Sequence, residues 1–171
     1  DSHTGMSAVE ETGFAGKSFH DAFPATRSEP AGLGAAKGWD MGAAGFVAAW
    51  ATENTRKSIY EAFRRREVYA STGPRITLRF FGGHDFGAAD LKAKDLAANG
   101  YRKGVPMGGD LKAHGGRKAP TFLVAAMKDP QGANLDRVQV VKGWLDADGN
   151  TQERIYDVAV SGGRRIGADG R

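Results

Sequence analysis

Residues 54–81 read NTRKSIYEAFRRREVYASTGPRITLRFF, and this stretch decides much of the fold because its apolar residues change their period halfway along. In its first half, Ile59, Ala62 and Phe63 recur at the i, i+3, i+4 spacing of a buried helical stripe. The Asn-Thr pair that opens the stretch can cap a helix by accepting its free backbone N–H groups. We therefore expect a helix at about 54–67.

A Thr-Gly-Pro break separates that helix from a β-rich remainder. Pro74 disfavours helical angles in the residue before it, and Gly73 accepts backbone angles that other residues avoid. Residues 75–81 then alternate apolar and polar side chains, which predicts a half-buried strand closed by the Gly-Gly pair that follows. Such strands joined by turns favour an antiparallel sandwich or meander over a βαβ sheet. Further strands are expected at 121–127, as a central strand, and at 137–144 and 154–160, as a hairpin.

Composition narrows the class of protein. With 171 residues, 40% of them apolar and 26% charged, the chain has the balance of a globular protein of one domain or parts of two. The lack of cysteine excludes disulfides, thiolate metal sites and thiol nucleophiles. The net charge is +4, but the positive residues are dispersed, so we expect no nucleic-acid partner. No apolar run is long enough for a membrane span, so we expect a soluble protein.

Asp1-Ser2-His3 is the sharpest chemical feature of the sequence. In an extended chain Asp1 and His3 point to the same side, so an oxygen and a nitrogen ligand could meet one divalent metal ion. Such a pair suits Zn, Mn or Fe. Two ligands do not close a metal site, however, and a polar chain end explains the same residues. The motif alone leaves both interpretations open.

The other acidic residues and histidines have simpler explanations. Glu10 and Glu11 point to different sides of a strand or a helix, which favours solvent-exposed side chains. His20 beside Asp21 could be a general base oriented by a carboxylate, although neighbours in sequence rarely reach that geometry. The two remaining histidines lie in glycine-rich surroundings typical of surface loops: His84 and His114.

Three further motifs resemble parts of ligand sites without completing them. Residues 146–150, DADGN, open like a calcium loop, but Thr151 and Asp157 stand where an EF-hand needs Gly and Glu, which favours a hairpin turn. Residues 104–110, GVPMGGD, could cradle a phosphate but lack the Lys-Ser/Thr ending of a P-loop, which favours a tight structural loop. The arginines at 64–66 offset the negative end of a helix dipole, with anion recognition as the alternative.

Five stretches of the chain together carry a family resemblance. The most specific is 48–76, which runs from AAWATENTRKSIYEAF to REVYASTGPRI, and the others are 1–11, 104–111, 119–122 and 135–144. They resemble the C-terminal half of the bacterial domain-of-unknown-function family 3604, which is similar to polymerase-and-histidinol-phosphatase (PHP) type metallohydrolases. The likeness covers nearly the whole chain.

That resemblance implies an α+β fold: the C-terminal end of a distorted β/α (PHP-like) barrel over 1–73, followed by an incomplete antiparallel β-sandwich-like domain over 74–171. In such barrels a metal cluster lies at the C-terminal ends of the strands, and a late Asp-x-His motif supplies its last ligands, here Asp1 and His3. The implied activity is hydrolysis of a phosphoester or related ester bond in a small molecule by metal-activated water. The candidates for binding the substrate are His20 and Arg64.

The earlier ligands of such a cluster, among them a His-x-His pair, are absent from this sequence. We therefore expect a fragment that is inactive alone, with the rest of the barrel supplied by a missing N-terminal part or another chain. The start without Met and the polar end agree with this. The compartment stays open, with the periplasm or export as options for a bacterial protein of this kind. The alternative is a non-catalytic β-rich binding or interaction module that docks through exposed aromatic residues: Phe14, Phe19, Phe23, Trp39 and Trp50.

Overall fold

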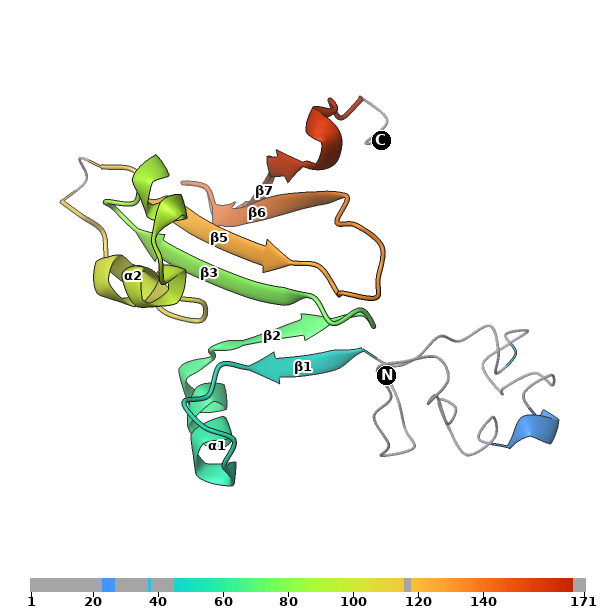
Figure 1. Ribbon diagram of the computed structural model, residues 1–171. Helices are drawn as coiled ribbons and strands as arrows, with labels where there is room; N and C mark the ends of the chain where they lie inside the picture. Colours follow the sequence, from blue (N-terminus) through green and yellow to red (C-terminus); the bar gives the residue numbers. More distant parts are fainter. Residues whose placement is uncertain (1–22, 27–36, 38–44, 116–117, 168–171) are drawn as a thin grey trace. The chain divides into compact units, whose positions relative to one another are not determined.

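The computed structural model describes residues 23–26, 37, 45–115 and 118–167 of the chain (Figure 1). In this part of the chain the fold is mixed α+β. The helices are α1 (Arg56–Arg65) and α2 (Leu96–Lys103). The strands are β1 (Phe46–Ala49), β2 (Val68–Ser71), β3 (Thr77–Gly83), β4 (Gly104–Pro106), β5 (Thr121–Met127), β6 (Arg137–Leu145) and β7 (Thr151–Val160). Short 3-10 turns lie at Pro24–Thr26, Ala88–Lys92 and Ser161–Gly163.

The strands form three small antiparallel sheets: β1 with β2, the three-stranded sheet β4-β3-β5, and β6 with β7. The predicted α+β class is confirmed at this level. No barrel closes within the described ranges, and the finer prediction of a barrel end followed by a sandwich stays a prediction. None of the described helices is long and apolar enough to cross a membrane.

Helix α1 occupies the centre of the predicted range. Thr55 caps its start, because the Thr55 hydroxyl accepts a hydrogen bond from the Ser58 backbone N–H (3.2 Å). Arg66 ends it in the left-handed conformation (φ 61°), and its N–H donates to the Ala62 and Phe63 carbonyl oxygens. The chain then reverses directly into β2, which pairs antiparallel with β1. Strand β1 lies in a Gly- and Ala-rich stretch where the sequence analysis placed no regular element.

The three-stranded sheet corrects two expectations about strand ends and order. The Gly-Gly pair at Gly82 and Gly83 does not close β3 but continues it, with partners on both sides. A Cβ on Gly83 would lie 2.8 Å from the Phe86 ring, so glycine is required there by close packing. Strand β5 was expected to be central, yet it is an edge of this sheet and β3 is central.

The core of this sheet forms under α2, a helix that the sequence analysis missed. Phe81 of β3 is 1% exposed, and its ring makes an edge-on contact with Tyr101 of α2 (centroids 5.2 Å apart). Gly100 allows this approach, since a Cβ there would lie 2.5 Å from the Phe81 ring. Leu123 of β5, 3% exposed, adds to the buried apolar residues.

The chain divides by its internal contacts into two compact units, residues 1–129 and 130–171. The second unit contains the hairpin β6–β7, which carries a bulge between Val138 and Gln139. The domain boundary expected at Gly73 stays a prediction. Contacts do cross that point, because Trp50 Nε1 donates to the Leu78 carbonyl oxygen (3.0 Å).

Candidate functional site

The predicted metal ligands, Asp1 and His3, lie outside the described residues, as does the substrate-binding candidate His20. Glu10, Glu11 and Asp21 lie outside them as well. Within the described residues no group of three His, Asp or Glu side chains is placed to hold a metal ion. The site predicted from Asp-x-His is therefore neither supported nor contradicted by the geometry.

Arg64, the other substrate-binding candidate, lies in the last turn of α1 with an exposed side chain. The two arginines after it have structural partners. Arg65 Nε is 2.8 Å from a Glu67 carboxylate oxygen, and Arg66 Nη2 is 3.7 Å from Asp110 Oδ2. Cations at this end of a helix also offset its dipole. Arg64 is exposed, so it could meet an anion from solvent.

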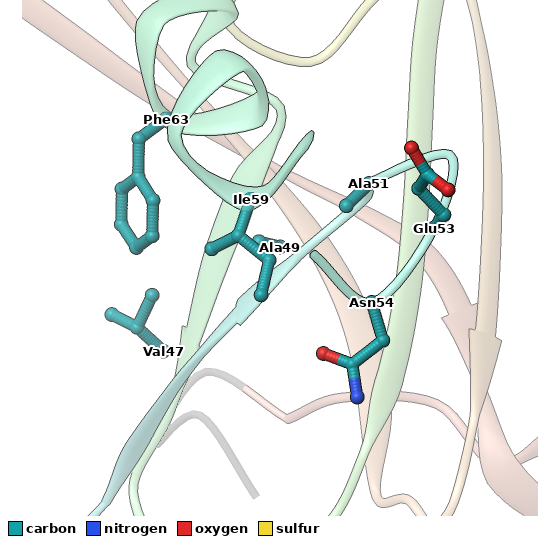
Figure 2. A pocket seen from close by; sticks show the side chains of 7 residues that line it. All are labelled: Val47, Ala49, Ala51, Glu53, Asn54, Ile59 and Phe63. Atoms are coloured by element: carbon teal, nitrogen blue, oxygen red, sulfur yellow. The ribbon is translucent and has the colours of Figure 1, made fainter. Parts of the chain in front are cut away.

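An open apolar groove lies between α1 and β1, with a volume of about 440 Å³. Its apolar wall comes from alternate residues of the strand and from the stripe of the helix, which Figure 2 shows pointing toward each other. Phe63 is 47% exposed and Val47 is 55% exposed, so the predicted buried stripe of α1 is only partly covered. The lining residues are Val47, Ala49, Ala51, Glu53, Asn54, Ile59 and Phe63.

A buried carboxylate ties the end of α1 to α2. Glu67 is 5% exposed and accepts hydrogen bonds from Arg65 Nε (2.8 Å) and from the Tyr101 hydroxyl. Burial, followed by the hydrogen bond to Glu67, raises the pKa of the Tyr101 hydroxyl above its usual value of 10.0. Arg79 donates to that hydroxyl (3.2 Å) and lies over the Trp50 ring at 3.3 Å. This network joins the end of α1, α2 and β3.

The same network bears on the aromatic docking surface expected for a binding module. Trp50 is half-buried, because its Nε1 is hydrogen-bonded and its face is covered by Arg79. Phe23 is 66% exposed. The other three aromatic residues of that surface, Phe14, Phe19 and Trp39, lie outside the described residues. Trp50 therefore takes part in packing, and the docking surface stays a prediction.

Two histidines that the sequence analysis placed in surface loops come together at one end of the sheet. The His84 and His114 rings have centroids 5.2 Å apart and are inclined by 34°. The register explains the contact: Gly83 at the end of β3 pairs with Thr121 at the start of β5. His84, which follows β3, therefore meets the loop that precedes β5. We call this pair and the space beside it the histidine cleft.

The histidine cleft has a volume of about 540 Å³ and a mixed lining. Its apolar wall is made by aliphatic residues of the loop before β5, namely Leu111, Ala113, Ala119 and Pro120. Lys112 and Lys118 bring positive charge. Lys118 forms an ion pair with Asp85, and this hydrogen-bonded contact lowers the pKa of the Asp85 carboxyl below its usual 3.8. The cleft thus adjoins a carboxylate that stays ionised.

The hydrogen bonds of His84 fix its tautomer. Its Nε2 lies 3.0 Å from the Lys112 carbonyl oxygen, and a carbonyl can only accept, so Nε2 carries the proton. In the neutral ring Nδ1 then holds a lone pair. That atom is buried and has no hydrogen-bond partner, the one such side-chain atom among the described residues. Leaving a buried acceptor unpaired costs about 1–3 kcal/mol, so a ligand for it would be stabilising.

The two motifs that resembled ligand loops have structural roles. Asp146 accepts backbone N–H bonds from Asn150 (2.9 Å) and Asp148 (3.0 Å), which lower the pKa of its carboxyl and close the hairpin turn. Residues 104–106 of the glycine-rich motif form β4, and the N–H of Gly109 turns back to the Pro106 carbonyl oxygen (3.0 Å). For both motifs the backbone therefore agrees with the structural interpretation, a hairpin turn at 146–150 and a tight loop at 104–110.

Sequence reasoning missed the histidine cleft because its two rings are thirty positions apart in the chain. A signal was present, however. Both strands were predicted, and pairing 75–81 with 121–127 as antiparallel neighbours would have placed the residues after one strand beside those before the other.

Comparison with known proteins gives one match. The model of the family described as "Protein of unknown function (DUF3604)" matches residues 1–171. No curated protein and no solved structure matches the chain.

Proposed function

The chain belongs to the DUF3604 family, and from this premise we propose that it supplies two ligands, Asp1 and His3, to the metal site of a metal-dependent hydrolase. The reaction is cleavage of a phosphoester or related ester bond in a small molecule by metal-activated water. The Asp1-Ser2-His3 motif carries the proposal, since its carboxylate and imidazole are donors that Zn, Mn and Fe accept. When bound, such an ion would activate the attacking water and polarise the bond under attack.

Two donors leave a catalytic metal site incomplete, because such sites usually have at least three protein ligands. The remaining ligands would come from the rest of a PHP-like barrel, supplied by a further part of the protein or by another chain. The residues from 74 onward would form the β-rich domain that follows this barrel. The chain alone is then inactive.

The open groove between α1 and β1 supports this arrangement. Phe63 and Val47 face one another with about half of each side chain exposed, on a helix whose apolar stripe is that of a buried element (Figure 2). Further barrel elements packed there would cover this apolar surface. Arg64, on the solvent side of the same helix, would pair with the negative charge of a phosphoester, and His20 would complete the substrate contacts.

The experiment compares this chain with a longer protein that contains it, each purified and analysed for bound Zn, Mn and Fe. Hydrolysis of bis(p-nitrophenyl) phosphate is expected only from the longer protein. There, Asp1→Asn and His3→Gln should each lower kcat by roughly a hundredfold or more, because a bound metal supplies several kcal/mol of transition-state stabilisation. Asp148→Asn, which alters an exposed carboxylate in the hairpin turn, is the matched control.

Two results would contradict the proposal. One is full activity and metal content in both the Asp1→Asn and His3→Gln variants. The other is a stoichiometric metal site with hydrolytic activity built by residues 1–171 alone.

A second candidate is a non-catalytic β-rich interaction module, and the hairpin β6–β7 is the observation that favours it. Every residue of β7 but the last is exposed, including Ile155 at 54% and Val158 at 54%. Exposed apolar strands of this kind are typical of interaction surfaces. The Asp1→Asn and His3→Gln variants separate the two candidates, since in an interaction module they would leave the metal content of the longer protein unchanged.

A further inference from the structure

We propose that the histidine cleft is a second divalent-metal site, separate from Asp1 and His3, in which His84 Nδ1 and His114 bind one imidazole-preferring ion such as Zn²⁺. The two rings come from different loops and meet at 5.2 Å between centroids. Imidazole nitrogen is a ligand that Zn, Cu and Ni share. The proposal does not depend on the hydrolase assignment.

The orientation of His84 is the first argument. A metal-binding histidine usually donates its other ring N–H to a carbonyl or a carboxylate, which fixes the ring and directs the lone pair at the metal. His84 has this arrangement: Nε2 is 3.0 Å from the Lys112 carbonyl oxygen, and Nδ1 is buried without a partner. An ion between the two rings would give Nδ1 the partner that it lacks.

The surroundings of the pair are the second argument. The His114 side chain is exposed on the loop that lines the cleft, so the cleft can be reached from solvent. The volume of about 540 Å³ leaves room for a hydrated ion. Asp85, the residue after His84, forms an ion pair with Lys118 and so neutralises the charge of that lysine beside the site.

The number of ligands defines the class of site. No third His, Asp or Glu joins the pair within the described residues, so water or an added ligand would fill the remaining positions. Such an open site binds less tightly than a closed four-ligand site. Binding would also link the loop before β5 to the end of β3, because one ligand lies on each of these two segments.

The test is a titration of the chain with ZnCl₂ by isothermal calorimetry, in a background carrying both Asp1→Asn and His3→Gln. This background removes the metal site of the proposed hydrolase, so the two proposals can fail independently. One equivalent of Zn²⁺ is expected to bind and to raise the thermal midpoint, since a ligand of the native state stabilises it. His84→Gln and His114→Ala should each weaken binding by about tenfold or more.

Two controls keep the result interpretable. Glu53→Gln removes an exposed carboxylate in the groove between α1 and β1 and should leave Zn²⁺ affinity unchanged. His114→Ala alters an exposed side chain, so its fold should be intact by circular dichroism even if His84→Gln disturbs packing. Long-range ¹H–¹⁵N spectra of the imidazoles should show Zn²⁺ at His84 Nδ1. No binding in the background, or binding that His114→Ala leaves unchanged, would overturn the inference.

Discussion

The sheet β4-β3-β5 and the hairpin β6–β7 are both antiparallel, but they bury their apolar side chains to very different degrees. Phe81 and Leu123 in the first are 1% and 3% exposed, because α2 covers one face of the sheet. Val141 and Ile155 in the second face each other across the hairpin at 56% and 54% exposed. An alternating sequence thus specifies a strand, whereas burial depends on what packs against it.

The hairpin has cation–π contacts between side chains on its own surface. Lys142 lies 4.7 Å from the centre of the Trp144 ring, and Arg154 lies 5.1 Å from that of Tyr156. Each exposed cation–π contact of this kind contributes about 0.5–1 kcal/mol. A two-stranded hairpin by itself is marginal in water, and such contacts and the turn at Asp146 add to its stability.

The largest expected difference between the two regions follows from truncating an aromatic ring in each. Phe81→Ala should lower the free energy of unfolding by about 3–5 kcal/mol, because it empties a closed space under α2. Tyr156→Ala, its matched control on the hairpin at 41% exposed, should cost about 1 kcal/mol or less. Urea denaturation followed by circular dichroism measures both. Equal losses would mean that the two regions are covered alike in solution.

Substituting one glycine in each region tests whether the sheet is more closely packed than the hairpin. Gly100→Ala should destabilise by about 1–2 kcal/mol, since overpacking against Phe81 at 2.5 Å outweighs the gain in helix propensity. Gly143→Ala in β6 should cause no loss, because the nearest atom to an added Cβ is 3.8 Å away. Thermal unfolding of the two variants gives the answer. A stabilised Gly100→Ala variant would show that α2 does not rest on the Phe81 ring.

The two regions can also be compared by how the contribution of one aspartate in each, Asp90 and Asp146, to stability depends on pH. Asp90 accepts bonds from Lys103 Nζ (2.6 Å), Asn99 Nδ2 (2.8 Å) and the Gly87 N–H (2.7 Å), and the lysine above all holds its pKa far below the usual 3.8. A lowered folded-state pKa adds stability that is complete above the unfolded value and lost as pH falls toward the folded one. The pKa of Asp146 in the hairpin turn is also lowered, in this case by backbone N–H donors, so its contribution to stability depends on pH in the same direction.

Asp90→Asn should therefore lower the thermal midpoint at pH 7, and the gap to the parent chain should narrow as pH falls below about 4. Asp146→Asn should show a smaller gap with the same trend, because no cation takes part in its hydrogen bonds. Calorimetric scans between pH 2 and pH 7 measure both. A gap that does not change with pH would indicate that these carboxylates act only as neutral hydrogen-bond partners.

The sequence predicted the local elements with strong periodicity and missed those defined by packing. The stripe of Ile59, Ala62 and Phe63 located α1, and the alternation from 75 located β3. Helix α2 was missed because its sequence, LAANGYRK, contains Gly100. The reason for a glycine at this position is seen only in the close packing of the helix against Phe81. The histidine cleft was missed for a related reason: it depends on strand pairing, which periodicity within one strand does not encode.

The smallest expected effect concerns the exposed face of the hairpin. Ile155→Thr keeps a β-branched side chain and removes apolar surface that is 54% exposed, so the free energy of unfolding should change by about 0.5 kcal/mol or less. Leu123→Thr in β5, at 3% exposed, is the matched control and should cost several times more because it places a hydroxyl in the core. Both are read from urea midpoints. If Ile155→Thr instead costs as much as Leu123→Thr, this face of the hairpin is covered in solution, and the contrast between the two antiparallel regions reflects a missing neighbour rather than a difference in their sequences.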